Sequence, residues 1–167
     1  ESSRERHPMT PNSEYSSEPL DPQFQRDLEK SGIPQEKWHR FSQHGLGTLI
    51  PKMGIFFEEL TAEYTVATMP VAENTQPGGL LHGGASAALL ETLGSFAANE
   101  AAPEGYVAVG TELNISHVRS ATSGLVRGTC IALKIGRSQC VHRIDITDER
   151  GKLISTGRMT NSIIPRR

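Results

Sequence analysis

The sequence has few cysteines, no long hydrophobic run and no excess of charge, and each shortage excludes a class of protein. Cys130 and Cys140 are the only cysteines among 167 residues, which is too few for a small disulfide-stabilised fold. No apolar stretch reaches the roughly 20 residues of a membrane-spanning helix. Lys and Arg total 17 against 19 Asp and Glu, a net charge of −2. Composition therefore predicts neither a nucleic-acid partner nor a membrane partner.

The two cysteines are expected to be core thiols. If they lie on the two strands of a hairpin that turns at Gly136 and Arg137, the implied register places Arg143 opposite Cys130 and Leu133 opposite Cys140. This register favours two separate thiols over a disulfide between them. Two cysteines without a nearby pair of histidines also make a poor zinc site. We therefore expect reduced thiols and no bound metal.

Composition divides the chain into three parts. Residues 1–20 are rich in Ser, Pro, Glu and Arg without a periodic apolar face, which predicts a disordered or loosely attached tail. Residues 21–49 predict short helices, because Asp21 can cap the first helix and Gly32 can end it. Residues 50–167 predict a single domain. The N-terminus lacks the charged and then apolar pattern of a signal peptide, so we expect a cytoplasmic protein.

The longest predicted helix spans residues 82–100, and the rest of the chain is organised around it. It begins with His82, Gly83 and Gly84 and continues with small or apolar residues that a single acid, Glu91, interrupts. A helix without a polar face is normally buried, so we expect a buried Glu91 that needs polar partners or a chemical role. The two glycine N–H groups should be free at the helix start, where an oxyanion could bind.

Two further residues could complete a site for acyl transfer. Ser95 lies one turn beyond Glu91, where its hydroxyl could orient the carboxylate or a water. The loop before the helix delivers Gln76 to the helix start, although a solvated loop glutamine fits the sequence equally well. An oxyanion site and an isolated acid are the two parts that acyl transfer requires. The alternative for Glu91 is a structural acid on the face of a helix.

Six segments have the pattern of β-strands. They cover residues 54–60, 62–71, 107–119, 125–135, 140–148 and 152–164. In the third segment, alternation predicts that Val107, Val109, Leu113 and Ile115 share one side. The order is two strands, one long helix and four strands, which predicts an α+β fold with an antiparallel sheet wrapped around the helix.

At this point the chain resembles the hotdog-fold acyl-CoA thioesterases, of the 4-hydroxybenzoyl-CoA and 1,4-dihydroxy-2-naphthoyl-CoA type. The resemblance covers roughly residues 50–164 and rests on QPGGLLHGGASAALLETLGSFA, VGTELNISHVR, GLVRG and IGRS. Its most specific part is the spacing of Gln76, His82, Glu91 and Ser95. It implies a hotdog fold, in which an antiparallel sheet of six strands wraps around one long central helix, here with short N-terminal helices added.

The resemblance also implies catalytic roles. Gln76 and the N–H of Gly83 would bind the thioester carbonyl oxygen, and His82 would help to hold that end of the site. Glu91 would be the nucleophile or the general base, and Ser95 would orient the carboxylate or a water. In the family these groups meet across a dimer interface, so we expect a homo-oligomer, either a dimer or a dimer of dimers.

Four further residues match positions at which relatives contact coenzyme A. They are His117, Arg119, Arg137 and Ser138. Arginine suits phosphate because its guanidinium can donate two parallel hydrogen bonds. Solvated residues at strand ends are the alternative for all four. No separate cofactor is implied, since CoA is part of the acyl-CoA substrate.

The resemblance favours hydrolysis of an aromatic acyl-CoA, such as 1,4-dihydroxy-2-naphthoyl-CoA or a hydroxybenzoyl-CoA. Gly110 would suit a flat ring lying against backbone. The alternatives are a medium-chain fatty acyl-CoA thioesterase, a hotdog dehydratase or hydratase, and a non-catalytic acyl-CoA-binding protein. Two departures from the family stand out: Ser120 replaces a frequent proline, and the long N-terminal extension, residues 1–45, could cover the acyl pocket.

Overall fold

The computed structural model describes residues 19–167, and nearly all of the expected tail lies outside the described residues. In chain order, the elements are α1 (Pro22–Lys30), the 3₁₀ helix η1 (Gln35–Phe41), α2 (Leu49–Met53), β1 (Phe56–Leu60), β2 (Tyr64–Pro70), α3 (Gly83–Ala101), β3 (Tyr106–His117), β4 (Leu125–Ile135), β5 (Gln139–Thr147) and β6 (Leu153–Pro165). All six predicted strands and the long helix are present, whereas α2 is not among the predicted elements.

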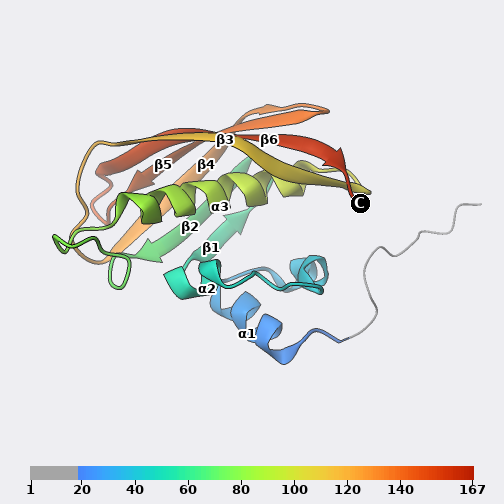
Figure 1. Ribbon diagram of the computed structural model, residues 1–167, viewed down its shortest axis with the longest axis horizontal. Helices are drawn as coiled ribbons and strands as arrows, with labels where there is room; N and C mark the ends of the chain where they lie inside the picture. Colours follow the sequence, from blue (N-terminus) through green and yellow to red (C-terminus); the bar gives the residue numbers. More distant parts are fainter. Residues whose placement is uncertain (1–18) are drawn as a thin grey trace, which may run out of the picture.

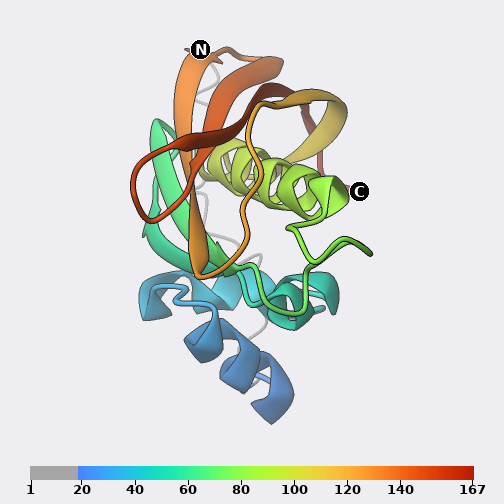
Figure 2. The ribbon, with the colours of Figure 1, turned by 90° about the vertical axis from the view of Figure 1, so that its left-hand side faces the viewer.

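The six strands form one antiparallel sheet in the order β1-β2-β4-β5-β6-β3. The sheet curves around α3, and the N-terminal helices lie beyond β1 and β2 (Figure 1, Figure 2). β1 and β3 are the two edges of this sheet. The predicted α+β hotdog architecture is therefore confirmed.

The leucines of α3 fix the helix against the sheet. Leu89, Leu90 and Leu93 are fully buried and belong to the main core. The approach to β4 is so close that a side chain at Gly128 would collide with Leu93. The helix ends just before Pro103, because the residue that precedes a proline disfavours helical backbone. These contacts hold α3 along the curved sheet and determine which of its faces is left for function.

The N-terminal helices pack onto the same core. Asp21 caps α1 by accepting a hydrogen bond from the Gln23 N–H at 2.7 Å. The chain turns after α1 at Gly32, whose φ of +70° favours glycine. Leu28 and Ile33 are buried in the core that also holds the α3 leucines. The predicted cap and stop of the first helix are thus confirmed.

The register of β4 and β5 differs from the prediction. Cys130 lies opposite Ile144, and Cys140 lies opposite Ile135. The predicted partners are wrong because the turn is centred one residue later than expected and a bulge in β4 then takes up one residue. Both cysteines are free and buried, as expected.

A bulge also changes the faces of β3 near its middle. Leu113 and Ile115 pack against the core, whereas on the other side of the bulge the buried residue is Ala108 and Val109 is exposed. One extra residue exchanges the two faces of a strand. The prediction of one common side for the apolar residues of this strand is therefore wrong.

Candidate active site

One stripe of α3 is not covered by the sheet. Gly84, Glu91 and Asn99 are exposed, and Ala88 and Ser95 lie half-buried between them. Their spacing of three and four residues places them on one face of the helix. The expectation of a buried Glu91 is therefore wrong for the single chain. The large leucines of α3, and not its small residues, determine which face packs against the sheet.

The start of α3 holds one backbone donor without an acceptor. His82 is the N-cap residue, and its Nδ1 accepts a hydrogen bond from the Gly84 N–H at 2.7 Å. The expected pair of free donors is thus reduced to the Gly83 N–H, which donates to no residue in the described part of the chain. The partial positive charge of the helix N-terminus is concentrated there. An oxyanion could bind at Gly83.

A cavity of about 380 Å³ lies beside this donor, and we call it the helix-start cavity. Gln76, Gly83, His117 and Arg119 all line it. The side-chain oxygen of Gln76 accepts a hydrogen bond from the Gly78 N–H, which orients the amide within its loop. The structure therefore brings together two expected oxyanion groups and two of the four expected CoA contacts.

The ring of His117 is set directly against Gly83. A Cβ atom at Gly83 would lie only 2.8 Å from His117 Nε2, so the approach requires glycine. The Nδ1 of the same ring lies 2.9 Å from the hydroxyl oxygen of Ser155, which is fully buried. Ser155 is not among the predicted site residues. The signal that could have found it is its place opposite His117 in the β3–β6 pairing, which needs the register to be known.

Glu91 lies at the middle of α3, beside the edge strand β3. A Cβ atom at Gly110 would lie 3.8 Å from Glu91 Oε1, so the carboxylate faces bare backbone. The Ser95 hydroxyl donates to the sulfur of Met159 at 3.8 Å, a weak acceptor. In the single chain, Ser95 is thus directed at the core and does not contact the carboxylate.

The two parts of the expected site are separated along one helix. Gly83 and Glu91 are eight residues apart, which corresponds to about 12 Å of α-helix. One thioester carbonyl cannot contact both groups at that distance. The chain therefore holds two half-sites, an oxyanion half with Gln76, His82 and Gly83, and an acid half with Glu91 and Ser95.

The four expected CoA contacts also fall into two groups. His117 and Arg119 lie at the end of β3, whereas Arg137 and Ser138 form the β4–β5 turn. The Ser138 carbonyl accepts a hydrogen bond from the Ile163 N–H at 2.9 Å. Along β6, Ile163 is eight residues from the partner of His117, or about 26 Å of strand. Within one chain these two groups cannot bind the same phosphates.

A second cavity, of about 590 Å³, lies at the other end of α3, and we call it the helix-end cavity. Phe41, Phe96, Asn99, Tyr106, Val107 and Arg166 are among its lining residues. Phe96 stacks on two other rings, with its centroid 5.8 Å from that of Phe41 and 4.8 Å from that of Phe57. The sequence analysis does not identify this cavity, because its walls come from distant segments without a shared motif.

The buried titratable groups are not suited to catalysis. Burial raises the pKa of the Cys130 thiol to about 12 and also raises the pKa of Cys140, so neither thiol is an activated nucleophile. Burial lowers the pKa of His142, whose Nε2 lies 2.8 Å from the Ala62 carbonyl oxygen. Residues 19–167 contain no group of three or more His, Cys, Asp or Glu residues that could hold a metal ion. Within the same range, no helix is both long and apolar enough to cross a membrane.

Known proteins share both the sequence and the fold. Residues 78–155 match the thioesterase superfamily model. The chain is 45% identical over 120 residues to a proofreading thioesterase of Cronobacter sakazakii. The matched residues make up 71% of this chain and 88% of that protein. The chain belongs to the thioesterase superfamily. This thioesterase is also 43% identical over 121 residues to the 1,4-dihydroxy-2-naphthoyl-CoA hydrolase of Escherichia coli, covering 72% of this chain and 89% of that protein.

Solved structures agree with this assignment. The crystal structure of a thioesterase from Haemophilus influenzae matches this thioesterase with a TM-score of 0.69 and 37% identity, over 72% of this chain and 85% of that chain. The expected resemblance and the expected enzyme class, a thioester hydrolase, are therefore confirmed. The roles of individual residues, the acyl group and the oligomeric state stay predictions.

Proposed function

We propose that this thioesterase hydrolyses an aromatic acyl-CoA, such as 1,4-dihydroxy-2-naphthoyl-CoA or a hydroxybenzoyl-CoA, to the free acid and CoA. The observation that carries this proposal is that α3 presents two complementary groups on its uncovered side. These are the Gly83 N–H, which has no acceptor in the described chain, and the exposed carboxylate of Glu91. The names of the relatives in Escherichia coli and Cronobacter sakazakii support a thioester of an aromatic acid as the substrate.

The two half-sites meet if two chains pack their α3 helices antiparallel. Ala87 is midway between Gly83 and Glu91 in the sequence. A two-fold axis near Ala87 places Gly83 of each chain opposite Glu91 of the other. Ala87 and Ala88 are small, which permits the helices to approach closely. The unpaired edge of β3 can then pair with its own copy. We therefore propose a homodimer, or a dimer of such dimers, with two shared sites.

The oxyanion half polarises the thioester in this arrangement. The Gly83 N–H donates to the carbonyl oxygen, and the amide nitrogen of Gln76 can add a second hydrogen bond. Negative charge grows on this oxygen as the carbonyl carbon is attacked, and one well-placed donor contributes about 3 kcal/mol to the transition state. His82 caps the helix start and keeps the Gly83 backbone in position.

Glu91 of the other chain supplies the attack. As a nucleophile, its carboxylate oxygen bonds to the carbonyl carbon, the C–S bond breaks, CoA leaves as the thiolate, and water then hydrolyses the mixed anhydride. As a general base, the carboxylate takes a proton from a water whose oxygen bonds to the same carbon, after which the C–S bond breaks and CoA again leaves as the thiolate. The Ser95 hydroxyl, held only by a weak bond to sulfur, can turn to either the carboxylate or the water.

The nucleotide of CoA requires residues from more than one chain. His117 and Arg119 line the helix-start cavity, where the pantetheine arm would leave the thioester. Arg137 and Ser138 lie at the far end of the same sheet, so a second copy would bring them to the phosphates. An arginine from each side could donate paired hydrogen bonds to phosphate oxygens.

The surroundings of Glu91 support an aromatic acyl group. Gly110 leaves flat backbone beneath the carboxylate, and the ring of Phe96 lies farther along the same helix. Aromatic rings favour offset stacking on such rings over contact with a flexible chain. A medium-chain fatty acyl-CoA is the competing substrate, and the assay below compares the two directly.

The experiment measures thiol release from benzoyl-CoA, a hydroxybenzoyl-CoA, 1,4-dihydroxy-2-naphthoyl-CoA, octanoyl-CoA and acetyl-CoA with a thiol-reactive chromophore. We expect the highest kcat/KM with an aromatic acyl group. A preference for octanoyl-CoA would replace the aromatic assignment with the medium-chain one. Absence of release from every acyl-CoA would contradict the proposal. Glu91→Gln protein purified in parallel controls for contaminating hydrolases.

A further inference from the structure

The helix-end cavity lies farther along α3 from Glu91. Ser95 and Asn99 follow Glu91 at intervals of four residues on the same stripe, so Asn99 lies about 12 Å farther along α3. Asn99 lines the helix-end cavity. In the proposed antiparallel dimer, Gly83 of the partner subunit lies opposite Glu91, so a thioester held between them has Ser95, Asn99 and then the helix-end cavity next to it along the same stripe. An acyl group that runs along this stripe enters the helix-end cavity.

The wall of this cavity nearest the site is aromatic. Phe96 comes from α3 and Phe41 from η1, and the two rings stack at 21° with centroids 5.8 Å apart. Tyr106 lines the cavity from the start of β3. The amide of Asn99 is engaged with Ala108 of the same strand, through an N–H···O bond of 3.0 Å. The cavity therefore offers rings rather than free polar groups at this point.

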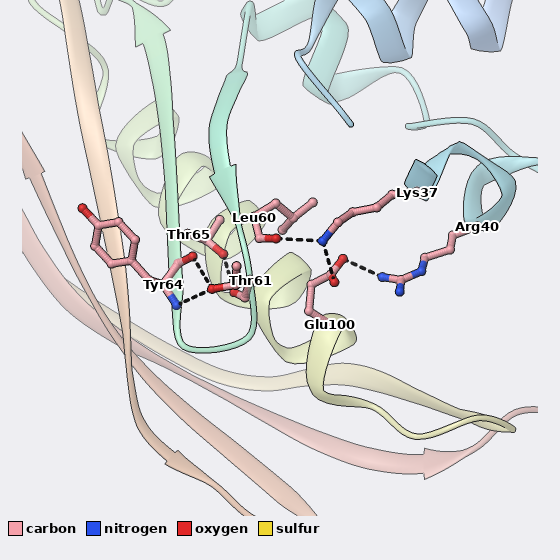
Figure 3. A network of polar contacts seen from close by, with 7 residues as sticks. All are labelled: Lys37, Arg40, Leu60, Thr61, Tyr64, Thr65 and Glu100. Atoms are coloured by element: carbon pink, nitrogen blue, oxygen red, sulfur yellow. Dashed lines mark hydrogen bonds and ion pairs between the residues drawn. The ribbon is translucent and has the colours of Figure 1, made fainter. Parts of the chain in front are cut away.

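An ion-pair network holds η1 in place at the far end of the cavity. Glu100 accepts hydrogen bonds from Lys37 at 2.8 Å and from Arg40 at 2.6 Å, and Lys37 also donates to the Leu60 carbonyl (Figure 3). The Glu100 side chain is only 13% exposed and that of Lys37 18%. An acid in the last turn of a helix opposes the helix dipole. Lys37 and Arg40 compensate the charge of Glu100 and connect η1 to the end of α3.

The far wall lies outside the region that the chain shares with its family model. That model matches residues 78–155, whereas η1 spans Gln35–Phe41. The core of the family therefore supplies the near part of the cavity, and the N-terminal extension of this chain supplies the far part. The size of the cavity depends on where the extension is docked.

From this arrangement we propose that η1 closes the acyl pocket and excludes long acyl chains. The inference rests on the proposed function, because it takes the acyl group to lie beyond Glu91. Phe41 is the residue that limits length, and Glu100 is a positioning residue that acts through Lys37 and Arg40. The pocket then selects a compact ring-containing acyl group and rejects a straight chain that is too long for it.

The test compares acyl-CoAs of increasing length, from butanoyl to tetradecanoyl, with benzoyl-CoA as the reference. Phe41→Ala should raise the kcat/KM ratio of tetradecanoyl-CoA to benzoyl-CoA by about tenfold, because it removes the far wall. Glu100→Gln should shift the ratio in the same direction by less, since it loosens η1 without removing the ring. Leu49→Ala alters an exposed residue of α2 that does not line the cavity, and it should leave the ratio unchanged.

Binding of hydrolysis-resistant thioether analogues, S-benzyl-CoA and S-tetradecyl-CoA, separates this inference from the proposed function. If the parent hydrolyses no thioester but Phe41→Ala selectively improves binding of the long analogue, the proposed function fails and the inference stands. If the parent hydrolyses thioesters and both variants melt like the parent with unchanged length profiles, the inference is wrong. An unfolded Phe41→Ala protein would leave Glu100→Gln to decide between these outcomes.

Discussion

The two ends of α3 are built from different groups. At its start, the helix offers bare glycine backbone, an N–H without an acceptor in the described chain, and the ring of His117 set against Gly83. At its end, the helix lies among stacked rings, and the acid Glu100 is already paired with Lys37 and Arg40. At the first end, the Gly83 N–H is available to donate a hydrogen bond to a ligand. At the second end, Glu100 is already paired within the protein, and the stacked rings offer a surface of fixed shape.

The two ends of α3 are therefore suited to different tasks, the start to catalysing hydrolysis and the end to selecting the acyl group. A group that binds the oxyanion must be unoccupied until charge develops, which is the condition at the helix start. A wall that selects by size must be rigid, which is the condition at the helix end. Glu91 lies between the two and faces solvent in the single chain. Substitutions at the start and middle of α3 should therefore change rates, and substitutions at its end should change which acyl group is accepted.

The largest effect is expected at Glu91. Glu91→Gln keeps the size of the side chain and removes its charge and nucleophilicity, so kcat should fall by about 10²–10⁴. The melting temperature should not change, because the carboxylate makes no hydrogen bond or ion pair within residues 19–167. The measurements are kcat on one hydrolysed acyl-CoA and a thermal melt. Turnover within about threefold of the parent would remove Glu91 from the mechanism.

A pair of substitutions at Gly83 tests the helix start. Proline at the first helical position is well tolerated, and the extended backbone of His82 (ψ 130°) suits a following proline. Gly83→Pro removes the N–H, and Gly83→Ala adds a similar Cβ near His117 but keeps the N–H. The proline variant should have a kcat about 10²–10³ below that of the alanine variant. Equal kcat values in the two variants would show that the N–H does not bind the oxyanion.

Smaller effects are expected at the arginines. Arg119→Ala and Arg137→Ala should each raise KM for acyl-CoA by about tenfold and change kcat little, because contacts to phosphate persist in ground and transition states. The exposed Arg26 of α1 provides the matched control. The parent's KM for a pantetheine thioester should be higher than for acyl-CoA. Equal values would show that the nucleotide is not bound.

The smallest effect concerns the pH dependence of stability through His142, which is buried in β5. Burial lowers the pKa of His142 from its ordinary value of 6.5, so the unfolded chain takes up a proton at a higher pH than the folded chain. Stability from this residue is complete above pH 6.5 and is lost as the pH falls through and below that value. The melting temperature of the parent should therefore drop more between neutral and mildly acidic pH than that of His142→Leu. Parallel pH profiles would contradict this.

Local sequence patterns were sufficient to predict most of the helices and strands, but they were not sufficient to predict the register in which the strands pair. The glycine pair after His82 and the apolar run after it predict α3 to within one residue at each end. The bulges in β3 and β4 have no comparable signal, because one extra residue leaves alternation intact on both sides. That is why the prediction for the faces of β3 is wrong. The predicted partner of Cys130 is wrong because the β4–β5 turn lies one residue later than expected and the bulge takes up only part of that shift. α2 is only five residues long, too short for a helical period to be recognised.

The candidate site shows the same division. Gln76, His82 and Gly83 are close in sequence, so their grouping at the helix start could be predicted from the motif. Ser155 and Phe41 could not, because each reaches the site through tertiary packing across the sheet or from the N-terminal extension. The exposure of Glu91 also escaped prediction, since a run of small residues does not show which side of a helix another chain would cover.

The most direct test of the shared site is complementation between two inactive variants. Glu91→Gln chains keep the oxyanion half, and Gly83→Pro chains keep the acid half. Co-expressed in equal amounts, they should form mixed oligomers in which about a quarter of the sites hold both intact halves, one from each chain. The account predicts kcat near one quarter of the parental value for the mixture. A mixture no more active than the better of the two variants alone would contradict it.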